Sequence, residues 1–122
     1  FRSPFQAAGI PVQAIQLLHG SRECLGYRIG KIAYLTDLSE ICKPSFYQLK
    51  DLSVLVLDCV RLKPHRTHLN MDQAVELAKK IGAKRTYLTH LGHDFDYRRV
   101  SAKLPKGIFL AYDGLRMSWS QK

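Results

Sequence analysis

The chain has 122 residues, of which 46% are hydrophobic and 24% are charged, so its composition is globular and excludes intrinsic disorder. Its length fits one folding unit. No apolar run approaches the about 20 residues of a membrane span and no basic-then-apolar leader is present, so we expect a cytoplasmic protein without membrane contact. A start at Phe1 leads us to expect a processed product or a piece of a longer protein.

The charge is strongly basic, with 19 Lys and Arg against 10 Asp and Glu and a net charge of +9. Such an excess favours anionic partners, such as nucleic acid, phosphorylated small molecules or anionic lipid. The basic residues are scattered, which equally suits a basic solvated surface. The three cysteines, Cys24, Cys42 and Cys59, form no CxxC pair. They predict reduced thiols in a cytosolic compartment, with Cys59 as a small core residue, and do not support a disulfide framework or a zinc knuckle.

The first half of the chain is dominated by strand patterns. Residues 12–18 partly alternate between apolar and polar and predict a strand. Residues 25–29 and 31–35 flank a glycine and predict the two strands of a hairpin. A short helix is expected over residues 46–51. The continuous apolar run 53–57 is typical of a strand that is buried on both faces.

The second half alternates between helix and strand patterns. An asparagine cap, apolar residues at helical spacing and a terminating glycine predict a helix over residues 70–81. A strand is expected over residues 84–89 and a further helix over residues 94–103. Residues 107–112 and 115–119 flank Asp-Gly and predict a final hairpin. This order predicts an α/β fold in which a mixed β-sheet carries helices on one face.

The five histidines fall at the ends of predicted strands or in the loops that follow: His19, His65, His68, His90 and His93. Asp37 and Asp58 also follow predicted strands. Strand ends can meet at one edge of a sheet, where imidazole and carboxylate groups are suitable ligands for zinc, manganese or iron. A carboxylate such as Asp37 can bridge two cations that hold phosphoester oxygens. The alternative for each histidine is a solvated surface residue, which we favour for His65.

Five segments of the chain occur in a family-like order: Tyr-Leu-Thr-Asp at 34–37, Val-Leu-Asp at 56–58, His-Arg-Thr-His-Leu-Asn at 65–70, Leu-Thr-His-Leu-Gly-His-Asp at 88–94, and Tyr-Asp-Gly at 112–114. Together they resemble the C-terminal half of a metallo-β-lactamase-fold hydrolase. The chain is most similar to the phosphoribosyl cyclic phosphate phosphodiesterase family, and next to RNase Z, the tRNA 3′-processing endonuclease. The resemblance implies that residues 1–122 form one half of an αβ/βα sandwich.

The resemblance also implies roles for particular residues. His19, Asp37 and His90 match metal ligands of a site for two divalent cations, zinc or manganese, which Asp37 bridges. His68 matches a catalytic histidine that binds phosphate or protonates the leaving group, a role that a near-neutral imidazole can fill. Asp58 and His93 fall at positions similar to those of family residues that orient a metal ligand or bind substrate.

The family's His-x-His-x-Asp-His motif, which supplies the remaining ligands, does not occur in these 122 residues. We therefore expect that an N-terminal half is missing and that this chain alone binds metal weakly and is inactive. Its open sheet face would need a cover, either that half or a second copy in a dimer. The expected parent activity is metal-dependent hydrolysis of a small cyclic phosphate or related phosphoester. The alternatives are RNase Z-like processing of nucleic acid and a non-catalytic interaction module.

Overall fold

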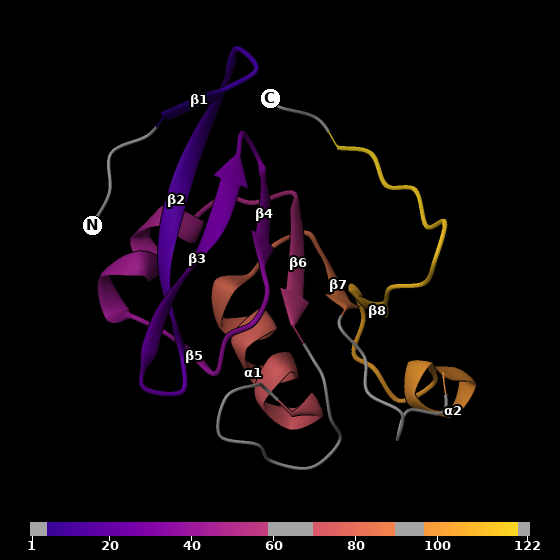
Figure 1. Ribbon diagram of the computed structural model, residues 1–122. Coiled ribbons are helices and arrows are strands. Elements are labelled where there is room, and N and C mark those ends of the chain that lie inside the picture. The colour runs from indigo at the N-terminus through magenta and orange to yellow at the C-terminus, as the bar shows by residue number, and fades with distance from the viewer. Residues whose placement is uncertain (1–4, 59–69, 90–96, 120–122) are drawn as a thin grey trace.

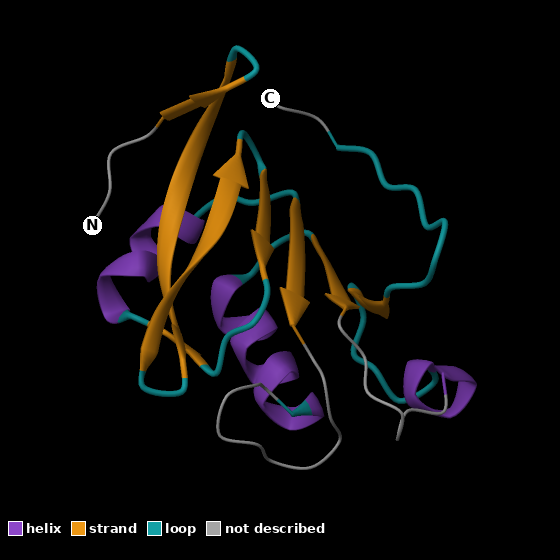
Figure 2. Cartoon of the chain, in the orientation of Figure 1, coloured by secondary structure: helices purple, strands orange, loops and turns teal. Residues whose placement is uncertain are grey.

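The computed structural model describes residues 5–58, 70–89 and 97–119. Within them, eight strands form a mixed sheet whose path runs β1-β2-β3-β4-β6-β7-β8, with β5 paired to β2 (Figures 1 and 2). The strands are β1 (Phe5–Ala7), β2 (Ile10–His19), β3 (Arg22–Ile29), β4 (Ile32–Leu35), β5 (Glu40–Ile41), β6 (Val54–Asp58), β7 (Arg85–Thr89) and β8 (Ile108–Leu110). The helices are η1 (Lys43–Leu49), α1 (Met71–Ile81) and α2 (Tyr97–Ser101). None of these helices is long and apolar enough to cross a bilayer.

The antiparallel part of the sheet consists of β1 to β4. Strand β2 pairs with β3 from Gln13↔Arg28 to His19↔Arg22, and β3 pairs with β4, so the predicted strands and hairpin are confirmed. Strands β1 and β5 were not predicted, because three and two residues are too short to show a period. A Cβ atom at Gly26 would lie only 2.5 Å from Cδ2 of Leu35, so glycine lets the core leucine lie against β3.

The parallel part of the sheet consists of β4, β6, β7 and β8. Side chains Val54 and Leu55, which point to opposite faces of β6, are both fully buried, so the prediction of a strand buried on both faces is confirmed. One face packs against Ala74 and Ala78 of α1, with Leu49 of η1 in the same core cluster. The predicted mixed sheet with helices on one face is therefore confirmed.

Helix α1 begins and ends where the sequence predicts. The backbone N–H of Gln73 donates to the Asn70 side chain over 2.8 Å, and the Asn70 N–H donates to the Gln73 side chain over 3.0 Å. This reciprocal capping box satisfies two of the helix's unpaired N–H groups. At the other end Gly82 adopts a left-handed conformation with φ of 74°, and its N–H donates to the carbonyl of Ala78. Local signals alone therefore define both ends of this helix.

The helix expected over residues 46–51 is a 3-10 helix that spans Lys43–Leu49. It begins early because a proline at its first turn favours helical φ. Arg28 of β3 holds its end, since Nη1 donates to the carbonyls of Gln48 (2.9 Å) and Lys50 (2.6 Å). Burial lowers the pKa of the Arg28 guanidinium, and the Asp51 carboxylate partly opposes this effect.

The C-terminal region differs from the prediction. Helix α2 spans Tyr97–Ser101, shorter than the expected 94–103, although 94–96 lie outside the described residues. The predicted strand over residues 115–119 is wrong. Its turn forms, since the Leu115 N–H donates to the Tyr112 carbonyl over 3.0 Å. The segment then packs through side chains rather than pairing with β8: Leu115, Met117 and Trp119 contact the cluster of Val54, Val56 and Tyr87.

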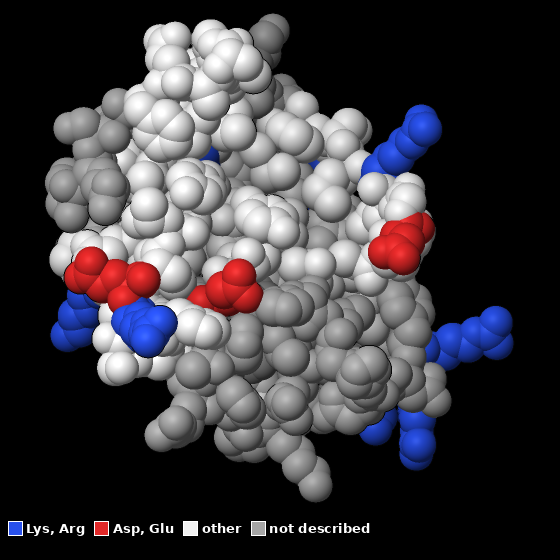
Figure 3. Space-filling view, viewed as in Figure 1, with Lys and Arg blue, Asp and Glu red and all other residues white. Residues whose placement is uncertain are grey.

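The face of the sheet opposite α1 carries a row of large side chains. The strand register aligns Tyr27, Tyr34, Val56, Tyr87 and Phe109, which we call the aromatic row. Tyr34 is 52% exposed and Phe109 45%, and the Phe109 ring stacks on Tyr87 at 5.3 Å. Figure 3 shows that much of the described surface in this view is uncharged. The exposed aromatic surface on this face is thus divided: Tyr27, Tyr34 and Phe109 are exposed, whereas Val56 and Tyr87 are buried and residues 115–119 pack against them.

Candidate functional site

Several strands end together at one edge of the sheet, which we call the carboxyl edge. Strands β4, β6, β7 and β8 are parallel, and β2 runs in the same direction because two antiparallel pairings separate it from β4. A row of buried leucines lies just inside this edge. Its members are aligned across the four parallel strands: Leu35, Leu57, Leu88 and Leu110. Residues that follow this row are held on a well-packed base, as is usual for sites in α/β folds.

His19 is the last residue of β2 and lies at the carboxyl edge. Its side chain is half-buried, and its Nδ1 atom is shielded from solvent. The strand pairing with Arg22 and the turn at Gly20 fix the backbone here. The prediction that this histidine ends a strand is confirmed. Its role as a metal ligand remains a prediction.

Asp37 lies two residues beyond the end of β4, at the same edge. Its side chain is exposed, and its φ of 57° places the backbone in the left-handed region that aspartate tolerates better than most residues. The Cys24 thiol donates to the Asp37 carbonyl over 3.3 Å, and the next residue, Leu38, is fully buried. The backbone is therefore anchored on both sides while the carboxylate faces outward. We did not predict the contribution of Cys24, because it depends on the pairing of distant strands.

The other predicted site residues are described only in part or not at all. Asp58 ends β6 opposite Thr89 of β7, so its backbone lies at the carboxyl edge, but its side chain is not described. His68, His90 and His93 lie outside the described residues, as does His65. The roles assigned to them remain predictions.

The described donors fit part of a metal site. An imidazole at His19 and a carboxylate at Asp37 are the ligand types that zinc and manganese take, and both come from the carboxyl edge. Among residues 5–58, 70–89 and 97–119 no group of three or more His, Cys, Asp or Glu side chains could hold a cation. A complete site would therefore need further ligands.

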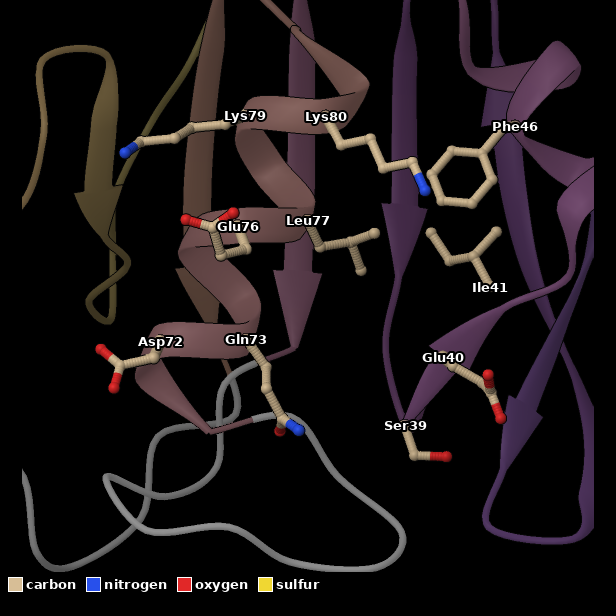
Figure 4. Close-up of a pocket in the computed structure, with 10 residues that line it drawn as sticks. All are labelled: Ser39, Glu40, Ile41, Phe46, Asp72, Gln73, Glu76, Leu77, Lys79 and Lys80. Atoms are coloured by element: carbon tan, nitrogen blue, oxygen red, sulfur yellow. The ribbon is translucent and has the colours of Figure 1, made fainter.

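A groove that the sequence did not predict lies on the helical side of the sheet, between α1 and the segment from Ser39 to Phe46. It has a volume of about 790 Å³. Figure 4 shows the Lys80 ammonium beside the Phe46 ring, and the nitrogen lies 4.5 Å from the ring centroid. Leu77 and Ile41 face each other across the groove. Because the groove mixes acidic and basic side chains, it has no clear preference for an anion or a cation.

Known proteins of several kinds resemble this chain. A crystal structure described as a new diphosphatase from the PhnP family is 41% identical, with a TM-score of 0.93 over 96% of this chain and 46% of that one. Zinc-bound PqqB from Methylobacterium extorquens is 16% identical with a TM-score of 0.69, over 96% of this chain and 53% of that one, and shows the fold alone. An octanoyltransferase of Porphyromonas gingivalis is 33% identical over 98% of this chain but only 25% of its own length.

The chain thus spans about half the length of the solved structures and a quarter of the octanoyltransferase, so the names of those proteins describe more than this chain contains. The family described as the β-lactamase superfamily domain matches residues 2–91, which is well over half of the 122 residues. The predicted resemblance is confirmed. The chain belongs to the β-lactamase superfamily, and its mixed sheet matches about half of a metallo-β-lactamase fold.

Proposed function

We propose that this chain is the C-terminal half of a metal-dependent phosphohydrolase that cleaves a phosphodiester or diphosphate bond. The observation that carries the proposal is the 41% identity to a PhnP-family diphosphatase along 96% of the chain. His19 and Asp37 at the carboxyl edge support it, because these donor types suit a site for divalent cations. A small cyclic phosphate and an organic diphosphate are both compatible substrates, since each presents a P–O bond between anionic oxygens.

The proposed chemistry divides among the chain's own residues. His19, Asp37 and His90 would hold two divalent cations, zinc or manganese. When bound, such cations activate water and stabilise charge on phosphoryl oxygens. In the hydrolysis, water loses a proton to solvent, its oxygen bonds to phosphorus, and the bond between phosphorus and the leaving oxygen breaks. His68 would then donate its proton to that oxygen.

The remaining proposed roles concern orientation. Asp58 follows the leucine row at the end of β6, where a carboxylate can hold a ligand imidazole in one tautomer. His93 would contact the substrate or orient a ligand. Both roles rest on the family resemblance and on the position of the preceding strands.

We further propose that the aromatic row is covered by the other half of the domain, which would also bring the missing metal ligands. The chain's match to about half of the solved relatives supports this partner over a second copy. Tyr27, Tyr34 and Phe109 are each at least 40% exposed, and exposed apolar surface of this kind typically marks a contact with another protein surface.

In the absence of the other half, the aromatic row is expected to make the isolated chain self-associate. Replacing Tyr34 by aspartate should abolish this self-association, measured by sedimentation velocity. A charge placed in the middle of an apolar contact would have to be desolvated on association. Tyr112→Asp is the matched control, because Tyr112 is 58% exposed but does not belong to the aromatic row. In a polypeptide extended by the other half, self-association should disappear even without a mutation. A dimer that persists in that longer polypeptide would instead show that a second copy covers the row.

The proposed activity is tested with the extended polypeptide and with this chain alone. With added zinc or manganese, the extended protein should hydrolyse bis(p-nitrophenyl) phosphate and either a cyclic phosphodiester or an organic diphosphate, while this chain alone should not. Preference for one of the two natural bond types decides the substrate class. Absence of metal-dependent hydrolysis on all three would refute the proposal and favour a non-catalytic interaction module.

The net charge of +9 supports one alternative, an RNase Z-like enzyme that acts on nucleic acid. Exposed Arg98 and Arg99 on α2 add to this basic surface. Binding of tRNA would then weaken steeply as salt rises, because each phosphate contact releases counterions. Weak binding with a shallow salt dependence would dismiss this alternative.

A further inference from the structure

One serine joins the end of β2 to the segment that follows β4. The Ser39 hydroxyl accepts a hydrogen bond from the Gly20 N–H (3.0 Å) and donates one to the Leu18 carbonyl (3.3 Å). The Ser39 N–H also donates to the Leu18 carbonyl, over 2.7 Å. A single hydroxyl can donate and accept at the same time, so one residue holds the backbone on both sides of His19.

The same short segment carries Asp37. Its carbonyl accepts the Cys24 thiol hydrogen bond, Leu38 is fully buried, and Ser39 then bonds to β2. Three consecutive residues are thus each held by a different contact with the core or with a neighbouring strand. Strand β5 continues the attachment, because Glu40 pairs with Leu18. The result is a short covalent and hydrogen-bonded path from the Asp37 backbone to the His19 backbone.

We infer that Ser39 is a positioning residue that sets His19 relative to Asp37 for cation binding. The effect on cation binding rests on the proposed function. The hydrogen bonds that Ser39 makes on both sides of His19, which we call the Ser39 clamp, do not depend on it. Ser39 acts through the two peptide groups that flank His19 and does not need to contact the cation. Groups that orient a metal ligand typically change the metal affinity 10- to 100-fold, so roughly this range is expected here.

Ser45 provides a matched control, because its hydroxyl also bonds to a carbonyl of β2. The Ser45 hydroxyl donates to the Gln16 carbonyl of β2 over 2.8 Å, and Ser45 is buried. Ser45→Ala therefore removes the same kind of hydrogen bond from the same strand, but away from His19. Any loss that comes only from weaker packing of β2 should appear in both variants.

The experiment compares the wild-type chain with Ser39→Ala, Ser39→Thr and Ser45→Ala. In the metal-free chain, Ser39→Ala should speed amide exchange at Gly20 and shift the ¹⁵N signals of the His19 imidazole. With zinc ions alone as the probe, the same variant should lower the affinity reported by those signals about 10-fold or more. Ser39→Thr keeps the hydroxyl and should restore both properties, whereas Ser45→Ala should lower the melting temperature and leave both unchanged.

The outcomes separate this inference from the proposed function. If zinc shifts no His19 signal even in the wild-type chain, the metal role of this chain alone fails, and the His19 and Gly20 signals of the metal-free variants still decide whether Ser39 positions His19. If Ser39→Ala leaves those signals like wild type, or if Ser45→Ala alters them equally, the positioning role is overturned.

Discussion

Asp37→Asn is expected to lower phosphohydrolase turnover of the extended protein about 1,000-fold, which corresponds to about 4 kcal/mol of transition-state stabilisation. Asparagine has nearly the same size and also tolerates the left-handed backbone, where Asp37 has φ of 57°. The substitution therefore removes the negative charge while keeping the fold. A neutral amide cannot bridge two cations as a carboxylate can, so metal content should fall together with turnover.

Asp51→Asn is the control for this prediction. Asp51 has the same φ of 57° and is also exposed, but it precedes β6 and so lies at the opposite edge of the sheet. Elemental analysis and steady-state kinetics should show wild-type behaviour for this variant. Full metal content and turnover in Asp37→Asn would contradict the assignment of Asp37 as a metal ligand.

Leu57→Ala is expected to lower the free energy of unfolding by about 2–5 kcal/mol, because it leaves a cavity in the fully buried leucine row. Leu57 lies between Leu35 of β4 and Leu88 of β7 in the register, so the cavity would open at the centre of the parallel strands. Urea denaturation followed by circular dichroism measures the change, provided that the slope of the transition stays the same.

Tyr34→Ala tests whether this cost is specific to the helical side of the sheet. Tyr34 pairs with Val56 on the opposite face and is 52% exposed, so its truncation in the isolated chain should cost below about 1 kcal/mol. An equal loss in the two variants would mean that the aromatic row contributes as much to the stability of this chain as the leucine row.

Much of the fold could be predicted because its signals are local. Helix α1 shows its cap, its apolar spacing and its terminating glycine within 13 residues, from Asn70 to Gly82. Strand β6 is recognisable from an uninterrupted apolar run. The prediction of a strand over residues 115–119 was wrong because long-range packing decides the conformation of this segment. Its apolar side chains are buried against Val54, Val56 and Tyr87 of the sheet face, which requires no strand pairing.

The candidate site was likewise predictable from the sequence only in part. Histidine and aspartate at strand ends were visible in the sequence, and parallel pairing confirms that His19, Asp37 and the end of β6 lie at one edge. The Ser39 clamp was not visible, because Ser39 lies 19 residues from its partner Gly20 and no periodicity links them. The Cys24 contact with Asp37 joins positions 13 residues apart in the same way.

By itself, the sequence determined the longer strands, helix α1, the family and the types of donor available, since these depend on neighbouring residues or on ordered motifs. Only the tertiary structure decided which face of the sheet stays open and how the backbones of His19 and Asp37 are tied together. The physical reason is that burial and hydrogen bonding act between surfaces that the chain brings together only on folding.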